Sequence, residues 1–182
     1  MKKNAGILLS GCGSLTGSDP FEVAFLSSAL ESENFEITYL TISSKSILKK
    51  SSEISRGKLF SLKEITPKIL DVLAIPGGQG VLWNLLSNNG EPKKEVKEFL
   101  REIHLRKGII VALSLGVTLL SRCFKEYDFD FDLLRLKSGS YLVNSELNFI
   151  ISPGTITSGA PLILKKEIES VVKEIAILDS KS

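Results

Sequence analysis

The sequence has few residues of the kinds that usually form covalent cross-links or hold metal ions. Its 182 residues include two cysteines, Cys12 and Cys123, and one histidine, His104. Two cysteines cannot build a disulfide framework, and these two lack the spacing of metal ligands. We therefore expect a reducing compartment, and the sequence indicates neither a metal site nor a cofactor.

Long apolar runs and an excess of charge of one sign are also absent. No segment approaches the roughly 20 apolar residues that a membrane span needs, and the apolar stretch after Asn4 is too short for the core of a signal peptide. Lys and Arg number 23 against 21 Asp and Glu, a net charge of +2. This balance indicates neither nucleic acid nor a membrane surface as a partner. We predict a cytoplasmic protein.

What is present is ordinary for a globular protein. The chain is 43% hydrophobic and 24% charged, and its length suits one domain with a full core. No internal repeat or linker-like segment divides it. We therefore predict a single domain over residues 1–182.

Segments with the pattern of strands and helices alternate along the chain. Buried or alternating apolar runs predict strands, and helical spacing of apolar residues predicts helices. The predicted strands are 6–9, 35–42, 69–75, 108–113 and 149–152, and the predicted helices are 20–31, 81–86, 91–106, 115–120 and 161–178. The Ser- and Lys-rich segment 43–55 is expected to be a solvated surface loop. This order predicts an α/β fold, with a mostly parallel sheet covered by helices on both faces.

Ser114 stands between the predicted strand 108–113 and the predicted helix 115–120. α/β enzymes place a nucleophile at such a sharp strand-to-helix turn, where helix N–H groups can stabilise an anion. In parallel sheets, ligands collect outside the carboxyl ends of the strands. The loops 10–19 and 76–80 also leave such ends. We therefore predict that these three segments form one site.

Several motifs together resemble the ThiJ/PfpI superfamily, and most closely its ElbB-like branch. The motifs are Leu9-Ser-Gly-Cys-Gly13, Gly17-Ser-Asp-Pro-Phe-Glu22, Arg56-Gly57 and Asp71-Val-Leu-Ala-Ile-Pro-Gly-Gly78. The resemblance covers most of the chain, although the segment 125–143 looks shorter than its counterpart in the family. It implies a flavodoxin-like, glutamine-amidotransferase-like three-layer α/β sandwich that is usually a homodimer.

The resemblance also implies an active site centred on the elbow. The family's elbow nucleophile is a cysteine near a glutamate that matches Glu22, and relatives include cofactor-independent glyoxalases, deglycases and chaperone-like proteins. Here Ser114 stands in the cysteine's position. A thiolate attacks aldehydes readily, whereas a serine hydroxyl needs an oriented base. We expect His104 to lie away from the sheet's carboxyl edge, so the sequence does not predict a Ser-His-Asp triad.

Each candidate site residue has two alternative roles. Glu22 is either a site acid or a helix-terminal glutamate favoured by the helix dipole. The backbone N–H groups of Gly77, Gly78 and Leu115 form either an oxyanion hole, which can also bind a carboxylate, or an ordinary turn. Cys12 is either a reactive thiol and second candidate nucleophile or a small residue packed in a glycine turn.

Two further residues are not assigned to the elbow. Cys123 is expected to pack within its helix. Trp83 has three open roles, namely a pocket cover, a dimer contact and a core residue.

Three functions remain open. The first is a glyoxalase- or deglycase-related protein with lost or altered catalysis, because Ser114 replaces the nucleophilic cysteine, that retains a pocket for a small carbonyl or carboxylate ligand. The second is an active cofactor-independent glyoxalase or hydrolase that uses Ser114 with Glu22, or Cys12. The third is a stress-linked chaperone-like or interaction dimer.

Overall fold

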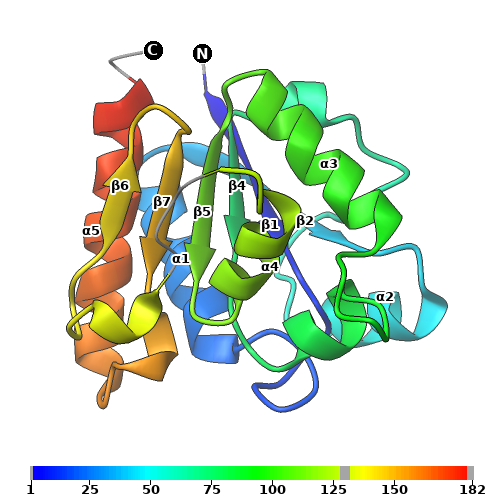
Figure 1. Ribbon diagram of the computed structural model, residues 1–182, viewed down its shortest axis with the longest axis horizontal. Helices are drawn as coiled ribbons and strands as arrows, with labels where there is room; N and C mark the ends of the chain where they lie inside the picture. Colours follow the sequence, from blue (N-terminus) through cyan, green and yellow to red (C-terminus); the bar gives the residue numbers. More distant parts are fainter. Residues whose placement is uncertain (1, 128–131, 180–182) are drawn as a thin grey trace.

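The computed structural model describes residues 2–127 and 132–179, which form one sheet flanked by helices (Figure 1). Its strands are β1 (Lys3–Leu8), β2 (Phe35–Thr41), β3 (Leu59–Ser61), β4 (Val72–Ile75), β5 (Ile109–Leu113), β6 (Leu142–Asn144) and β7 (Phe149–Ser152). Its α-helices are α1 (Pro20–Ser32), α2 (Lys45–Ser52), α3 (Lys94–Leu105), α4 (Gly116–Cys123) and α5 (Pro161–Asp179). A π-helical turn, η2, spans Val81–Leu85.

The strand order is β3-β2-β1-β4-β5-β7-β6. Every pairing is parallel except that of β6 with β7. From β1 the chain passes to β2 and then to β3 at one edge of the sheet. It then returns to β4, on the other side of β1, and continues to β5. It next forms β6 at the far edge, and β7 lies between β5 and β6. The order therefore reverses between β1 and β4, where open parallel sheets bind ligands.

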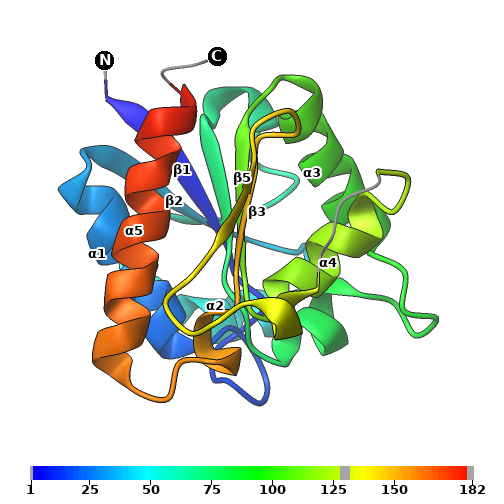
Figure 2. The same ribbon diagram turned by 60° about the vertical axis from the view of Figure 1, so that its left-hand side comes forward.

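Helices cover both faces of the sheet, so the fold has three layers, as the sequence predicts. Figure 2 shows α1 and α5 on one side of the sheet and α3 and α4 on the other. One apolar cluster joins the sheet to α1 and α5, through side chains such as Leu26 and Val171. A second cluster joins the opposite face to α2, α3 and α4, through Ile47, Leu100 and Leu120.

The prediction of a surface loop over 43–55 is wrong, because Lys45–Ser52 is the helix α2. Its apolar face is narrow, with only Ile47 and Ser51 buried, so the many Ser and Lys residues around it hide the helical period. Ser51 Oγ lies 3.2 Å from Thr41 Oγ1, which ties the helix to β2. Lys49 and Lys50 fall in its last turn, where cations interact favourably with the helix dipole.

Other boundaries also differ. The strand expected over 69–75 starts at Val72, because Pro67–Ile69 forms a 3-10 turn before it. The helix expected over 91–106 starts at Lys94, because Pro92 pairs with Leu86 in an isolated bridge. Within the short segment 125–143, residues 128–131 lie outside the described residues. Over the described ranges, no helix is both long and apolar enough to span a membrane.

Candidate functional site at the Ser114 elbow

Ser114 occupies the sharp turn between β5 and α4. Its φ is +48°, a left-handed conformation that costs a non-glycine residue energy and that usually marks a functional or tightly constrained turn. The turn is possible because α4 begins with Gly116, where a Cβ would lie 2.3 Å from Ile75 O. The strand-to-helix elbow expected at Ser114 is therefore present. Only 1% of Ser114 is exposed.

Glu22 lies against Ser114 and comes from the first turn of α1. Asp19 caps this helix, its carboxylate accepting hydrogen bonds from the backbone N–H groups of Phe21 (2.9 Å) and Glu22 (3.1 Å). Pro20 at the first helical position suits the same start. The helix start directs the Glu22 side chain inward, where it is fully buried and Oε1 makes a short hydrogen bond with Ser114 Oγ.

The Glu22 carboxyl group has partners on both oxygens. Oε2 accepts a 2.6 Å hydrogen bond from the Gly77 N–H. Oε1 lies 2.9 Å from the Thr155 N–H nitrogen and 2.8 Å from Thr155 Oγ1. Burial raises the pKa of Glu22, and the hydrogen bonds from Ser114, Thr155 and Gly77 only partly oppose this rise.

Two acceptors compete for the one hydroxyl proton of Ser114. This oxygen is 2.9 Å from Pro153 O and 3.1 Å from Thr155 Oγ1, in addition to its contact with Glu22. A carbonyl oxygen only accepts, so the single hydroxyl proton of Ser114 is required by Pro153 O. An ionised Glu22 would require the same proton. If Glu22 is protonated, its carboxyl donates to Ser114 Oγ and both contacts are satisfied, and burial shifts the pKa of Glu22 in that direction.

The N–H groups predicted to bind an anion differ in whether they already donate a hydrogen bond. The Gly77 N–H is engaged by Glu22, so it is not available to a ligand in this arrangement. Within residues 2–127 and 132–179, the N–H groups of Gly78 and Leu115 donate no hydrogen bond. Both residues are half-buried. They therefore remain as donors at the rim of the site.

The segment Pro153–Thr155 closes over the elbow, a role that the sequence analysis missed. Gly154 has a φ of +51°, and a Cβ there would lie 2.5 Å from both Ser114 Oγ and Glu22 Oε1. A side chain at position 154 would enter the site. One signal could have revealed this segment, since it leaves the carboxyl end of β7, beside β5.

A second buried acid, Glu167 of α5, holds this covering segment in place. It is 1% exposed, and its Oε1 accepts hydrogen bonds from Gly154 N (2.8 Å) and from Ser152 Oγ. Its Oε2 accepts from Gly139 N (2.8 Å) and Ser158 Oγ (3.4 Å). Glu22 and Glu167 thus bind adjacent residues of one segment, Thr155 and Gly154. The helical period of α5 could have revealed this acid, since Glu167 lies three residues after the buried Leu164 and four before the buried Val171.

The chain is similar to known proteins in its structure. No family model and no curated protein matches the sequence. An isoprenoid biosynthesis protein with an amidotransferase-like domain from Ehrlichia chaffeensis aligns with a TM-score of 0.88 and 19% identity, over 97% of this chain and 99% of that one. Drosophila melanogaster DJ-1beta aligns with a TM-score of 0.64 and 16% identity, over 100% of this chain and 97% of that one. The chain has the DJ-1/ThiJ/PfpI fold.

A further relative of the same fold is glyoxalase III from Candida albicans, with a TM-score of 0.61 and 7% identity over 97% of each chain. The resemblance inferred from the sequence motifs is thus confirmed at the level of the fold. So is the predicted α/β sandwich with a mostly parallel sheet.

Cys12 does not join the elbow of this DJ-1-like fold. It is half-buried, and no hydrogen bond links it to Ser114 or Glu22 among the described residues. Burial, and then the negative charge of Glu53, raise the pKa of its thiol. Because the thiolate is the reactive form, both effects lower the reactivity of Cys12 at neutral pH.

His104 and Cys123 have packing roles. The His104 ring lies 5.1 Å from the ring of Phe124 and 5.3 Å from that of Phe149, and Nε2 is 2.9 Å from Tyr127 OH. Cys123 is fully buried in α4, and burial raises its thiol pKa to about 12. Over the residues that the structure describes, no three His, Cys, Asp or Glu side chains are grouped to hold a metal ion.

Proposed function

We propose that this chain is an ElbB-like protein of the DJ-1/ThiJ/PfpI superfamily that has lost covalent catalysis at its elbow and retains a site for a small carbonyl or carboxylate ligand. The observation that carries the proposal is that Ser114 Oγ, with one proton, lies within hydrogen-bond distance of both Glu22 Oε1 and Pro153 O. In the arrangement that we propose, the hydroxyl donates to Pro153 O and a protonated Glu22 donates to the hydroxyl. A hydroxyl in this arrangement has no base to activate it.

The groups around Ser114 Oγ explain why a serine is inert where a cysteine would react. They are the Glu22 carboxyl, a carbonyl oxygen and the hydroxyl of Thr155, and none of them is a base at neutral pH in the proposed arrangement, in which Glu22 is protonated. A cysteine thiol needs only a lowered pKa to become nucleophilic, and the N-terminus of α4 supplies a favourable field. A serine in place of the cysteine therefore removes the reactive thiolate and leaves the surrounding groups of the site in place.

Ligand binding rests on the free donors at the rim. The Gly78 and Leu115 N–H groups are half-buried and unpaired within the described ranges, and α4 begins directly after Leu115. N–H groups at such a helix start bind anionic oxygen atoms. A carboxylate, or the polarised oxygen of a carbonyl compound, fits these donors without a covalent bond to Ser114.

The relatives support the ligand class. One is a glyoxalase III and another is an isoprenoid biosynthesis protein. The raised thiol pKa of Cys12 weighs against an active enzyme built on that residue. A cytoplasmic homodimer, without nucleic-acid or membrane partners, remains part of the proposal.

Methylglyoxal consumption by purified variants tests the proposal. We expect the wild-type protein and Ser114→Ala to match the buffer rate, and Ser114→Cys to exceed it by about tenfold or more, because it restores a thiol at the elbow. Ser121→Cys, in the same helix, adds a thiol away from Glu22 and controls for non-specific chemistry. Wild-type turnover that Ser114→Ala abolishes would contradict the loss of catalysis. Turnover that only Cys12→Ala abolishes would move the active site to Cys12.

A further inference from the structure

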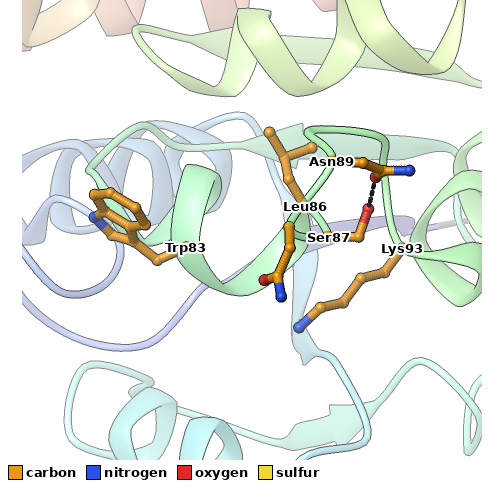
Figure 3. Close-up of a pocket in the computed structure, with 6 residues that line it drawn as sticks. Trp83, Leu86, Ser87, Asn89 and Lys93 are labelled. Atoms are coloured by element: carbon orange, nitrogen blue, oxygen red, sulfur yellow. Dashed lines mark hydrogen bonds between the residues drawn. The ribbon is translucent and has the colours of Figure 1, made fainter.

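A second candidate site lies beside η2 and shares no lining residue with the elbow. Two cavities of about 560 and 490 Å³ share a wall formed by Trp83, Leu86, Ser87 and Asn88. Figure 3 shows the lining of the first cavity, with Trp83 and Lys93 among its side chains. Lys93 completes the first cavity and Arg122 the second. We propose that this groove, here called the Trp83 groove, binds a planar aromatic ring that carries a phosphate group, the chemistry of a nucleoside monophosphate.

Trp83 offers the surface for the ring. It is 68% exposed, which excludes the core role left open by the sequence. It also lies on an anchored segment, because the neighbouring Asn84 side chain donates to Ser10 O (2.7 Å) and Thr16 O (3.1 Å). The segment is a π-helical turn, a rare conformation that is frequent at functional sites. An exposed indole on a rigid support is suited to stacking on a flat ligand.

Arg122 supplies a fixed positive charge. Its Nη1 donates a short hydrogen bond to Gly90 O. Gly90 has a φ of +79°, and a Cβ there would lie 2.6 Å from the same Nη1. The absence of a side chain at position 90 therefore makes room for the guanidinium at the groove.

Lys93 supplies a second positive charge at the other cavity. In Figure 3 its side chain extends along the groove toward the end that Trp83 occupies. Lys93 also directly precedes α3, whose N-terminus adds a positive partial charge that Glu95 in the first turn opposes.

The balance of charge selects a phosphate. Among the residues that the structure describes, no acidic side chain lines either cavity, and the nearest acid in sequence, Glu91, is paired with Lys125 at 3.4 Å. A phosphate monoester carries between one and two negative charges near pH 7 and offers three acceptor oxygens. In the proposed complex its oxygens accept from Lys93 and Arg122, one from each of the two adjoining cavities, with the Asn88 amide and the Ser87 hydroxyl as further polar contacts, whereas a carboxylate carries one charge.

Fluorescence of the single tryptophan gives a direct assay. Titration of the wild-type chain with AMP is expected to quench Trp83 emission to saturation. Adenosine, which lacks the phosphate, and inorganic phosphate, which lacks the ring, are each expected to bind at least about tenfold more weakly. Equal binding of adenosine and AMP would overturn the phosphate assignment, and the absence of saturable quenching by AMP would overturn the site.

Variants locate the binding. Lys93→Ala and Arg122→Gln should each weaken AMP binding by about tenfold. Lys94→Ala is the matched control, because Lys94 is exposed, pairs with Glu98 at 3.7 Å and does not line the groove. Calorimetry with Trp83→Ala, which removes the reporter and the stacking surface, should show no binding. Unchanged binding in Lys93→Ala or Trp83→Ala would overturn the proposal, as would a dimer in solution that buries Trp83 and excludes AMP.

Discussion

Glu167→Ala is expected to lower the free energy of unfolding by about 3–5 kcal/mol, because removing the carboxyl leaves two buried donors and one more exposed donor without an acceptor. The buried donors are Gly154 N and Ser152 Oγ, and the third is Gly139 N, in an exposed residue. Each orphaned buried donor costs about 1–3 kcal/mol, reduced where water reaches it. Urea unfolding at constant pH measures the loss, which would be a large fraction of a typical domain's stability.

Glu169→Ala is the matched control for that measurement. Glu169 lies two residues further along α5, is partly exposed and pairs with Lys165 at 3.7 Å. Such exposed pairs contribute little, so we expect a change below about 0.5 kcal/mol. If Glu167→Ala costs no more than Glu169→Ala, then Glu167 does not hold the segment over the elbow.

Gly77→Ala is expected to lower the free energy of unfolding by about 2–3 kcal/mol, because the added methyl group overpacks the elbow. A Cβ on Gly77 would lie 2.4 Å from Ser114 Cβ and 3.1 Å from Glu22 Oε2. The first contact is far inside the normal van der Waals limit, and both neighbours are buried side chains held by hydrogen bonds. Urea unfolding measures the loss.

A second substitution identifies the cause. Ser114→Gly removes the clashing Cβ and suits the positive φ at that position, so the double variant should lose less than the sum of the two single losses. Gly159→Ala is the control, because a Cβ there meets nothing within 4 Å. Strictly additive losses would show that Gly77 and Ser114 do not compete for the same space.

The elbow and its acid could be predicted from the sequence because both depend on local signals. An apolar strand before Ser114 and helical spacing after it define the turn, and Asp19 with Pro20 defines the helix start that carries Glu22. The parallel order of the strands then brings the two residues to one edge. Motif resemblance supplied the pairing of Ser114 with Glu22.

The covering segment could not be predicted in the same way, because its role depends on contacts between distant parts of the chain. Thr155 reaches Glu22 across 133 positions, and Glu167 reaches Gly139 across 28. Neither contact has a local pattern. The helix α2 was missed for a different reason, since only two of its eight residues are buried and polar residues dominate the remainder.

The protonation state of Glu22 tests the central claim most directly, because a protonated carboxyl cannot act as the base that Ser114 would need. Carbon NMR of protein labelled at the glutamate carboxyl carbons reports it, with the Glu22 signal assigned by its loss in Glu22→Gln. Pro153 O and Glu22 compete for the single proton of Ser114, and burial shifts the pKa of Glu22 upward, so the account predicts the signal of a protonated acid at pH 7. The signal of an ionised carboxylate at pH 7 would contradict the account and make Glu22 an available base for Ser114.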